Sequence, residues 1–431
     1  MLIDFITKNF ASFKNETELS FQTGARLYKY KETNTFPGKD VSVLKNLLLF
    51  GPNGAGKSEL LQGILTMAHL IRIGGTKSIT DKLVYNPFLF NPNSAKDLTY
   101  FAVTLKYQKQ IYEYSFSYDA DHIESEKLVL ILSNSEKTYF ERKGQDFLVL
   151  PDKLKGLTDN LRKNALFLYL AQQNNDLHAS GVFTWFSEDL VFLGSNVMIP
   201  EKMLELLSNE KLKQEMIDFL SFADFNIVDL NLRRVAIDDP ILRKISTQLD
   251  APLPTDRLEI YTSHKVYDDQ GNVLRTEELP LSSESQGTQR IFYIVLAMIF
   301  SQVNGNHKTI VIDEFDESLH HELADSLVKL FNTKENSNQF LLATHDLELL
   351  DNEIRTDQIY LIEKDFKGVS TLKSIFDFSD SRNLGRLNVS FLHRYLKGQF
   401  GAMPIIDLDG LKETLKSIHE EVKKSNNEKK A

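Results

Sequence analysis

Residues 51–58 have the residue types and the spacing that phosphate binding requires. Their sequence, Gly-Pro-Asn-Gly-Ala-Gly-Lys-Ser, fits the pattern G-x-x-x-x-G-K-S/T at every fixed position. In such a loop the glycines let backbone N–H groups approach phosphate oxygens with no Cβ in the way. Lys57 would contact the β- and γ-phosphates, and the Ser58 hydroxyl would be a ligand of Mg²⁺. The predicted phosphate-binding residues are Asn53, Gly54, Ala55, Gly56, Lys57 and Ser58.

A phosphate loop needs a strand before it and a helix after it, and the sequence supplies both. The apolar run from Val43 to Phe50 predicts a buried strand that leads directly into the loop. Residues 59–68 predict the helix that follows, and the N-terminus of a helix adds partial positive charge beside the phosphates. The segment therefore predicts a nucleoside triphosphate as the ligand.

Two later apolar runs end in polar residues that suit the same chemistry. The strand-like run from Thr309 ends in Asp313 and Glu314. Asp313 would hold Mg²⁺ through its water shell, and Glu314 would orient or polarise the attacking water. The run from Phe340 ends in a Thr-His pair, which would place His345 beside the γ-phosphate on a neighbouring parallel strand. Taken alone, each strand end also fits an ordinary solvated terminus.

A helix start between these elements offers an anion site. Ser285 and Gly287 come just before the apolar helical run of residues 291–300. A helix N-terminus with a Ser cap presents free N–H groups to an anion. A plain helix cap, without any ligand, is the alternative interpretation.

Composition limits the class of protein. The chain has 431 residues, 42% of them hydrophobic and 26% charged, which is typical of a globular protein. It has no cysteine, which excludes disulfides, thiolate zinc sites and a thiol nucleophile. The net charge of −10 disfavours a uniformly basic surface for nucleic acid. No apolar run is long enough to cross a bilayer, and Asp4 interrupts the stretch where a secretory signal would be apolar, so we expect a cytoplasmic protein without a membrane partner.

Changes in the apolar pattern along the chain predict four regions. Residues 1–150 would form an N-terminal lobe with the phosphate loop and a mainly antiparallel sheet, and residues 151–225 a helical insertion. Residues 226–405 would form a C-terminal lobe, and residues 406–431 a polar helical tail. The apolar positions of the insertion do not sustain a heptad, so we expect no long coiled coil.

The order of these motifs resembles that of an ATP-binding-cassette (ABC-type) ATPase of the SMC and RecF type. Residues 313–320, Asp-Glu-Phe-Asp-Glu-Ser-Leu-His, are closer still to the compact bacterial AAA-family ATPases of the AAA15/AAA21 grouping, which are related to the OLD and abortive-infection ATPases. Residues 9–14, 284–290 and 395–404 resemble the same grouping. The resemblance covers about residues 1–405 and implies an α/β fold: an ABC-type P-loop ATPase head with an antiparallel β-subdomain and a helical insertion.

The resemblance also implies a composite site for ATP and Mg²⁺. One protomer of a homodimer or higher homo-oligomer would supply Lys57 and the metal ligands Ser58 and Asp313, with Glu314 and His345 as catalytic residues. A second protomer would close the site with Ser285 and Gly287, and the segment Ser318–His320 would touch across the interface. The chain departs from the family pattern at Glu284, where a Leu is usual, and at Thr288. No Q-loop glutamine can be assigned, and residues 85–90 are where we expect that loop.

The function implied by the resemblance is that of an ATPase that senses or regulates in a bacterial anti-phage, abortive-infection system. A separately encoded effector, a nuclease or toxin, would act with it, because the segment after His345 has no further catalytic motif.

Two other functions remain as alternatives. One is a RecF-like or SMC-like ATPase of DNA repair or recombination, in which basic residues of the insertion or of the following segment would contact DNA: Lys153, Lys155, Arg162, Lys163, Arg233, Arg234, Arg243 and Lys244. Solvated helix faces would explain the same clusters. The other, a transporter's nucleotide-binding subunit, is disfavoured because the insertion does not resemble that of such a subunit.

Overall fold

The fold was analysed on a computed structural model of the chain. It describes residues 1–76, 78–133, 135–194, 200–222, 226–236, 256–303, 305, 307–378, 390–401 and 407–428. Two of the candidate DNA contacts, Arg243 and Lys244, lie outside the described residues, as do residues 402–404 of the family resemblance.

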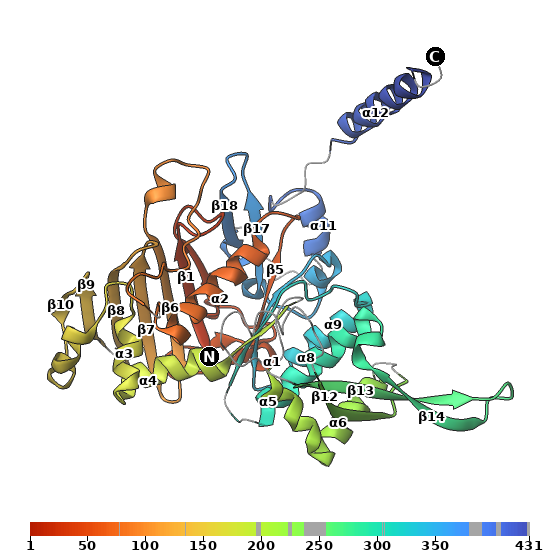
Figure 1. The fold of residues 1–431 in the computed structure, drawn as a ribbon, viewed down its shortest axis with the longest axis horizontal. Coiled ribbons are helices and arrows are strands. Elements are labelled where there is room, and N and C mark those ends of the chain that lie inside the picture. The colour runs from red at the N-terminus through yellow and green to blue at the C-terminus, as the bar shows by residue number, and fades with distance from the viewer. Residues whose placement is uncertain are drawn as a thin grey trace.

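A six-stranded sheet at the centre of the molecule carries the predicted nucleotide motifs (Figure 1). Its neighbouring strands are parallel except for the last pair. In spatial order the strands are β11 (Leu190–Leu193), β15 (Thr309–Ile312), β16 (Gln339–Ala343), β5 (Asn46–Phe50), β17 (Ile359–Lys364) and β18 (Ser370–Ser374). Because parallel strands all end at one edge, the loops that follow β5, β15 and β16 meet there.

The two faces of this sheet enter two separate cores. Leu47 and Leu49 of β5 belong to the buried cluster on one face, and Leu48 and Phe50 to the cluster on the other. Helix α2 (Lys57–Ile73) lies on the first face, between the two large sheets (Figure 1). Helices α8 (Gln286–Val303) and α9 (His321–Phe331) contribute to the second cluster. Burial on both faces explains why β5, β15 and β16 are runs of apolar residues after their first position.

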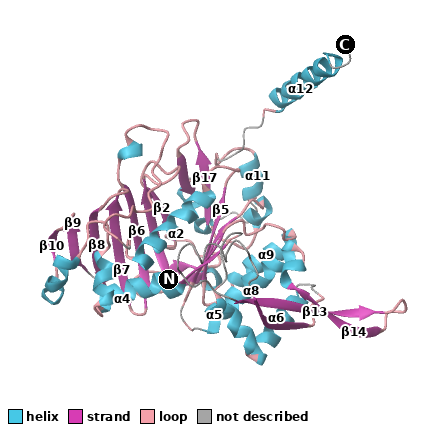
Figure 2. Ribbon diagram, in the orientation of Figure 1, coloured by secondary structure: helices cyan, strands magenta, loops and turns pink. Residues whose placement is uncertain are grey.

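A seven-stranded antiparallel sheet forms the other lobe, as the sequence predicts (Figure 2). It also recruits the first two strands of the chain. In spatial order the strands are β10 (Asp146–Val149), β9 (Ser135–Lys143), β8 (Ile123–Leu132), β7 (Gln110–Tyr118), β6 (Thr99–Tyr107), β1 (Leu2–Lys8) and β2 (Thr17–Ser20). The confirmed α/β head therefore consists of a parallel nucleotide sheet and an antiparallel sheet that share one core through α2.

The predicted helical insertion contains a strand. Leu190–Leu193, with four apolar residues in succession, is not helical; it forms β11 and extends the central sheet beside β15. The expectation of helix is wrong at these residues, because a run this short cannot show whether its period is helical or extended. The other elements of this region are the 3₁₀ segment Asp152–Asn160, α3 (Phe167–Gln173), α4 (Leu177–Thr184), the π-turn Trp185–Asp189, α5 (Glu201–Leu204), the 3₁₀ turn Glu205–Ser208 and α6 (Glu210–Phe222).

Smaller elements complete the described chain. They are α1 (Lys31–Asn34), β3 (Thr35–Phe36), β4 (Val43–Leu44), a three-stranded sheet of β12 (Asp229–Ala236), β13 (Asp256–Tyr267) and β14 (Val273–Pro280), α11 (Phe391–Leu396), α12 (Leu408–Glu428), and 3₁₀ turns at Ser94–Lys96, Leu281–Ser283, Leu347–Asp351, Thr356–Gln358 and Ile375–Asp377. None of the helices among the described residues has both the length and the apolar character that a membrane crossing requires.

A buried ion pair joins the antiparallel sheet to α3. The carboxylate of Glu126 on β8 accepts hydrogen bonds from Arg142 Nε at 2.8 Å and from the backbone N–H groups of Phe167 and Leu168, each at 2.8 Å. Tyr114 donates a further bond at 2.9 Å. Both charged side chains have no exposed surface, so the pair is fully removed from water.

Replacing Arg142 should destabilise the protein strongly. We expect Arg142→Met to lower the free energy of unfolding by about 3–5 kcal/mol, because Glu126 would keep a buried charge without its counter-ion. Urea denaturation followed by circular dichroism would measure the change. Lys155→Met is the matched control, since the Lys155–Asp152 pair is exposed to solvent and its loss should leave the free energy of unfolding almost unchanged. An equal effect of the two substitutions would contradict the prediction.

Candidate functional site

The phosphate loop lies between β5 and α2 and is supported from behind by two serines. The Ser370 hydroxyl lies 2.5 Å from the carbonyl oxygen of Ala55 and 2.6 Å from Ser12 Oγ. Gly56 has a φ of 117°, and a Cβ there would lie 2.6 Å from Ser370 Oγ. Both the backbone conformation and the close approach therefore require glycine at this position. The sequence motif predicts the loop, but it gives no sign of Ser370.

Lys57 is buried within the loop and faces His345. Its Nζ donates to the carbonyl oxygen of Gly51 at 2.6 Å and lies 3.4 Å from His345 Nδ1. Burial lowers the pKa of Lys57 to about 8, although Asp313 and other nearby acids act in the opposite direction. Triphosphate oxygens would supply the negative charge that favours the ammonium form.

The two predicted Mg²⁺ ligands lie together. Ser58 Oγ donates to Asp313 Oδ1 at 3.2 Å, which joins the start of α2 to the end of β15. A hydroxyl and a carboxylate are the oxygen ligands that Mg²⁺ prefers, and Mg²⁺ would complete its octahedron with phosphate oxygens and water. The donor set therefore fits Mg²⁺ on a nucleotide.

Glu314 follows Asp313 in a left-handed backbone conformation, with a φ of 50°. Arg290 of α8 holds this turn, because its Nη2 donates to the carbonyl oxygens of both Asp313 and Glu314, the latter at 2.9 Å. Partial desolvation raises the pKa of Glu314, and repulsion from Glu317 and Asp313 adds to the effect. A carboxylate with a raised pKa is a better proton acceptor, which suits the predicted role. The sequence gives no reason to single out Arg290.

His345 leaves the end of β16 as the parallel arrangement predicts. Its backbone N–H donates to Asp316 Oδ1 at 3.1 Å, so the loop after β15 holds the loop after β16. Desolvation lowers the pKa of His345, and the neighbouring Lys57 lowers it further. The imidazole is therefore neutral near pH 7, able to donate from one nitrogen and accept with the other.

Ser285 and Gly287 are at the start of α8 but not at the phosphate loop. Ser285 caps the helix, since its Oγ accepts from the Thr288 N–H at 3.1 Å, and its side chain is exposed. Across the described residues no hydrogen bond or ion pair joins Ser285 or Gly287 to residues 51–58. A Cβ at Gly287 would lie 2.6 Å from the carbonyl oxygen of Ser318, so glycine lets the segment 318–320 pack against this helix start.

Glu284, which departs from the usual Leu, has a structural explanation. Its carboxylate accepts hydrogen bonds from Thr262 and, at 2.6 Å, lies against His264 Nε2, both on β13. The residue therefore attaches the start of α8 to the three-stranded sheet.

Comparison with protein families then decides the relationship. The family model described as "AAA domain, putative AbiEii toxin, Type IV TA system" matches residues 47–351, which is more than half of the chain and includes every predicted site residue. The chain belongs to this AAA family. The predicted membership of the AAA15/AAA21 grouping is thereby confirmed, and with it an AAA-type, nucleotide-binding protein.

Solved structures also resemble the chain, at low identity. The SMC head domain from Thermotoga maritima matches with a TM-score of 0.37 and 14% identity, covering 86% of this chain and 98% of that one. The SMC head bound to the C-winged helix domain of ScpA matches with a TM-score of 0.43 and 13% identity, covering 89% and 99%. No match was found among curated protein sequences.

The segment predicted to contain the Q-loop of this AAA protein lies against its N-terminal motif. The N–H of Ala11 donates to the carbonyl oxygen of Asn86 at 2.8 Å, and the N–H of Phe88 donates to Asn9 Oδ1 at 3.2 Å. Residues 85–90 contain no glutamine, so the Q-loop assignment stays a prediction.

Four of the six candidate DNA contacts that the structure describes are paired with acids. Salt bridges at 2.7–2.9 Å join Lys153 to Asp176, Lys155 to Asp152 and Arg234 to Asp256, and Arg233 pairs with Glu278. Arg162 donates to the carbonyl oxygen of Thr76. Because the partners neutralise this positive charge, the structure adds no support for DNA binding through these residues.

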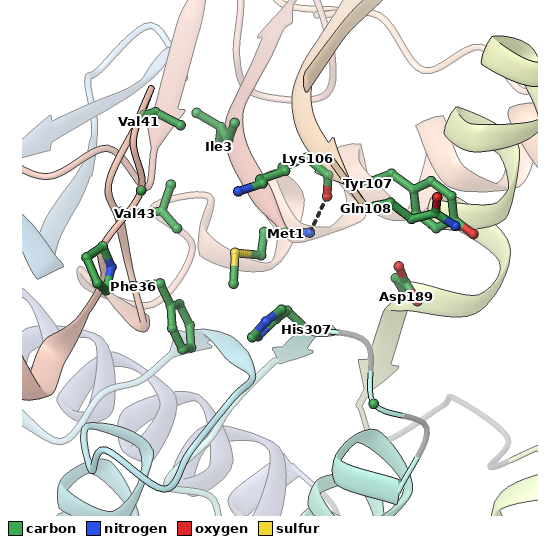
Figure 3. A pocket seen from close by; sticks show the side chains of 13 residues that line it. Met1, Ile3, Phe36, Val41, Val43, Lys106, Tyr107, Gln108, Asp189 and His307 are labelled. Carbon is green, nitrogen blue, oxygen red and sulfur yellow. Dashed lines mark hydrogen bonds between the residues drawn. The ribbon is translucent and has the colours of Figure 1, made fainter. Parts of the chain in front are cut away.

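A cavity of about 390 Å³ lies elsewhere, between β1, β3, β4 and the loop before β15 (Figure 3). Phe36, Val43, Lys106 and His307 are among its lining residues, and none of residues 51–58 is. The cavity is therefore not part of the nucleotide site.

The support behind the phosphate loop can be tested by substitution. We expect Ser370→Ala to weaken ATP binding about fivefold, because the Ala55 carbonyl loses a hydrogen bond of about 1 kcal/mol. Isothermal titration calorimetry would measure the affinity. Ser374→Ala on the same strand is the control, since Ser374 caps the turn Ile375–Asp377 and should leave ATP affinity unchanged. An unchanged affinity in Ser370→Ala would refute this role.

Proposed function

We propose that the protein is an ATP hydrolase whose active site is completed by a second copy of the chain. The observation that carries the proposal is the division of the predicted site within one chain. Lys57, Asp313 and His345 lie together, whereas the exposed start of α8 at Ser285 has no bond to them. The N-terminus of a helix favours anions, so this exposed helix start could bind the phosphate that a second copy of the chain holds.

The chemistry follows from the residues that lie together. Lys57 and the loop N–H groups would neutralise and orient the phosphates, and Ser58 and Asp313 would hold Mg²⁺, which polarises the phosphate oxygens when bound. Glu314 would accept a proton from the attacking water, and neutral His345 would donate a hydrogen bond towards the γ-phosphate. Ser285 and the N–H groups at Gly287 of the second copy would add donors as the charge develops.

The surface beside the start of α8 is consistent with docking of a second copy. A hollow of about 620 Å³ is lined there by Gln286, Arg290, Glu317 and Ser318, among others. Dimerisation would thus depend on ATP, and hydrolysis would separate the two copies.

We further propose that this cycle regulates a separate effector in abortive infection. The family description supports the setting, since its words are "putative AbiEii toxin, Type IV TA system". Among the described residues, one group of three His, Asp or Glu side chains is close enough to share a cation. The group is His321, Asp346 and Glu348, and it lies beside the ATPase loops, so it does not form a separate nuclease site. This is consistent with a nuclease or toxin activity carried by a separate polypeptide.

A mixing experiment tests the shared site. Lys57→Ala and Ser285→Arg should each abolish hydrolysis, the first by removing the phosphate contact and the second by disabling only the half-site that Ser285 supplies to the other copy. Mixed at equal concentration, they should recover about a quarter of the wild-type rate, because half of the dimers are mixed and each has one complete site. Colorimetric phosphate release would measure it. No recovery, together with an active Ser285→Arg variant, would refute a site shared between copies.

A plating assay tests the setting. We expect cells that carry this gene with its neighbouring reading frame to reduce phage plaque counts at least about tenfold, and Glu314→Gln to alter that protection because ATP would persist at the interface. The Lys155→Met variant is the control, since its exposed pair lies outside the nucleotide site. Equal plaque counts with and without the gene pair would argue against a defence role.

A further inference from the structure

His321 joins the loop after β16 to the start of α9. It is the first residue of α9 and directly follows the segment Ser318–His320. Its Nδ1 lies 2.6 Å from Asp346 Oδ2, and its Nε2 lies 3.3 Å from Glu348 Oε2. One imidazole therefore contacts two carboxylates through two different nitrogens.

The contact bears on the position of His345, because Asp346 is the next residue in the chain. The loop has two attachments: the His345 N–H donates to Asp316, and the Asp346 carboxylate contacts His321. Between them, the His345 side chain faces Lys57 with 3.4 Å between the two nitrogens. Loss of the second attachment would remove the side-chain contact that holds the residue directly after His345.

We infer that His321 is a positioning residue that keeps His345 beside Lys57 and connects the segment Ser318–His320 to the hydrolytic residues. The inference rests on the proposed function, in which ATP is hydrolysed at this site and the segment 318–320 lies at the interface between two copies.

The protonation state of His321 controls the strength of this attachment. A neutral imidazole has one N–H and can donate to one carboxylate, whereas the imidazolium donates to both. The charged groups that face it are all acidic: Asp346 and Glu348 from the loop after β16, and Asp325 from α9 itself. The hydrogen bond with Asp346 raises the pKa of His321 above its ordinary value.

The sign of the pH dependence follows from this shift. Because the folded-state pKa is raised, both hydrogen bonds are present below about pH 6.5, and the attachment weakens to one bond as the pH rises through the higher, folded-state pKa. Each imidazole nitrogen has its own carboxylate within 3.3 Å, which is the arrangement of a hydrogen-bonded ion pair.

Steady-state ATP hydrolysis by the full chain between pH 6 and 8.5 tests the inference. We expect His321→Gln to lower kcat about tenfold at pH 6, with KM for ATP within about twofold, because a charge-assisted bond is replaced by a weaker neutral one. The difference from wild type should shrink towards pH 8.5. The wild-type kcat should decrease as the pH rises and His321 loses its proton. Arginine stays charged over this range, so His321→Arg should keep kcat within about threefold of wild type at pH 6 and should not show that decrease at high pH.

His122→Gln is the matched control. His122 also lies between two carboxylates, with Nδ1 2.9 Å from Asp119 and Nε2 3.4 Å from Glu124, but in the turn between β7 and β8. It should leave kcat and its pH profile unchanged. A His321→Gln rate within twofold of wild type at every pH, or a His321→Arg profile identical to wild type, would overturn the inference. A wild-type chain that binds ATP without hydrolysing it would overturn the proposed function, and this inference with it.

Discussion

The parallel register of the central sheet is the constraint on which the nucleotide site depends. β16 lies between β5 and β15, with Leu341 opposite Leu47 on one side and Val311 on the other. Alternate residues of each strand enter different cores, so a slip of one residue would move every apolar side chain to the wrong face. The register that buries these side chains also fixes where the chain leaves each strand. The chemistry at the sheet edge is therefore positioned by packing in the two cores.

Negative charge is concentrated at that edge, and its compensation comes from other elements. The loop after β15 carries four acids within five residues, Asp313, Glu314, Asp316 and Glu317. Asp316 accepts a hydrogen bond from the backbone N–H of His345 in the next loop. Arg290 of α8 donates to the carbonyl oxygen of Glu314 in the acidic turn. Because α8 begins directly after the exposed Ser285, a displacement of that helix start would also move the side chain that holds the acidic turn. Arg290 therefore both stabilises the acidic turn after β15 and links that turn to the exposed start of α8.

The sequence predicted the parts of the site that are local in the chain. The phosphate loop, the acidic pair and His345 are each a few consecutive residues that follow an apolar run, and the strands before them are where those runs indicate. What the sequence could not show depends on contacts between distant residues. Ser370 touches a carbonyl 315 positions away, and Arg290 bonds to a turn more than twenty residues further on. Such partners have no pattern of spacing to reveal them.

The fold shows the same division between local and distant information. Most of the antiparallel lobe was predictable from alternating runs, because β6 to β10 are neighbours in sequence, whereas the pairing of β1 with β6 joins distant segments. The strand β11 was not, since four apolar residues are too few to show a period and the partner that makes them a strand, β15, lies far along the chain. The apolar face of α12 was also missed: Leu408, Leu411, Leu415, Ile418 and Val422 are all more than half exposed.

The support behind the phosphate loop has a consequence for synthesis of the protein. Ser12 and Ser370 are 358 positions apart, yet they touch behind the loop. During translation, residues 51–58 leave the ribosome long before β18, which supplies Ser370, has been synthesised. A nascent chain would therefore have a nucleotide-binding sequence without a finished binding loop for most of its translation. The contact between these two serines can therefore form only in nearly complete copies of the chain.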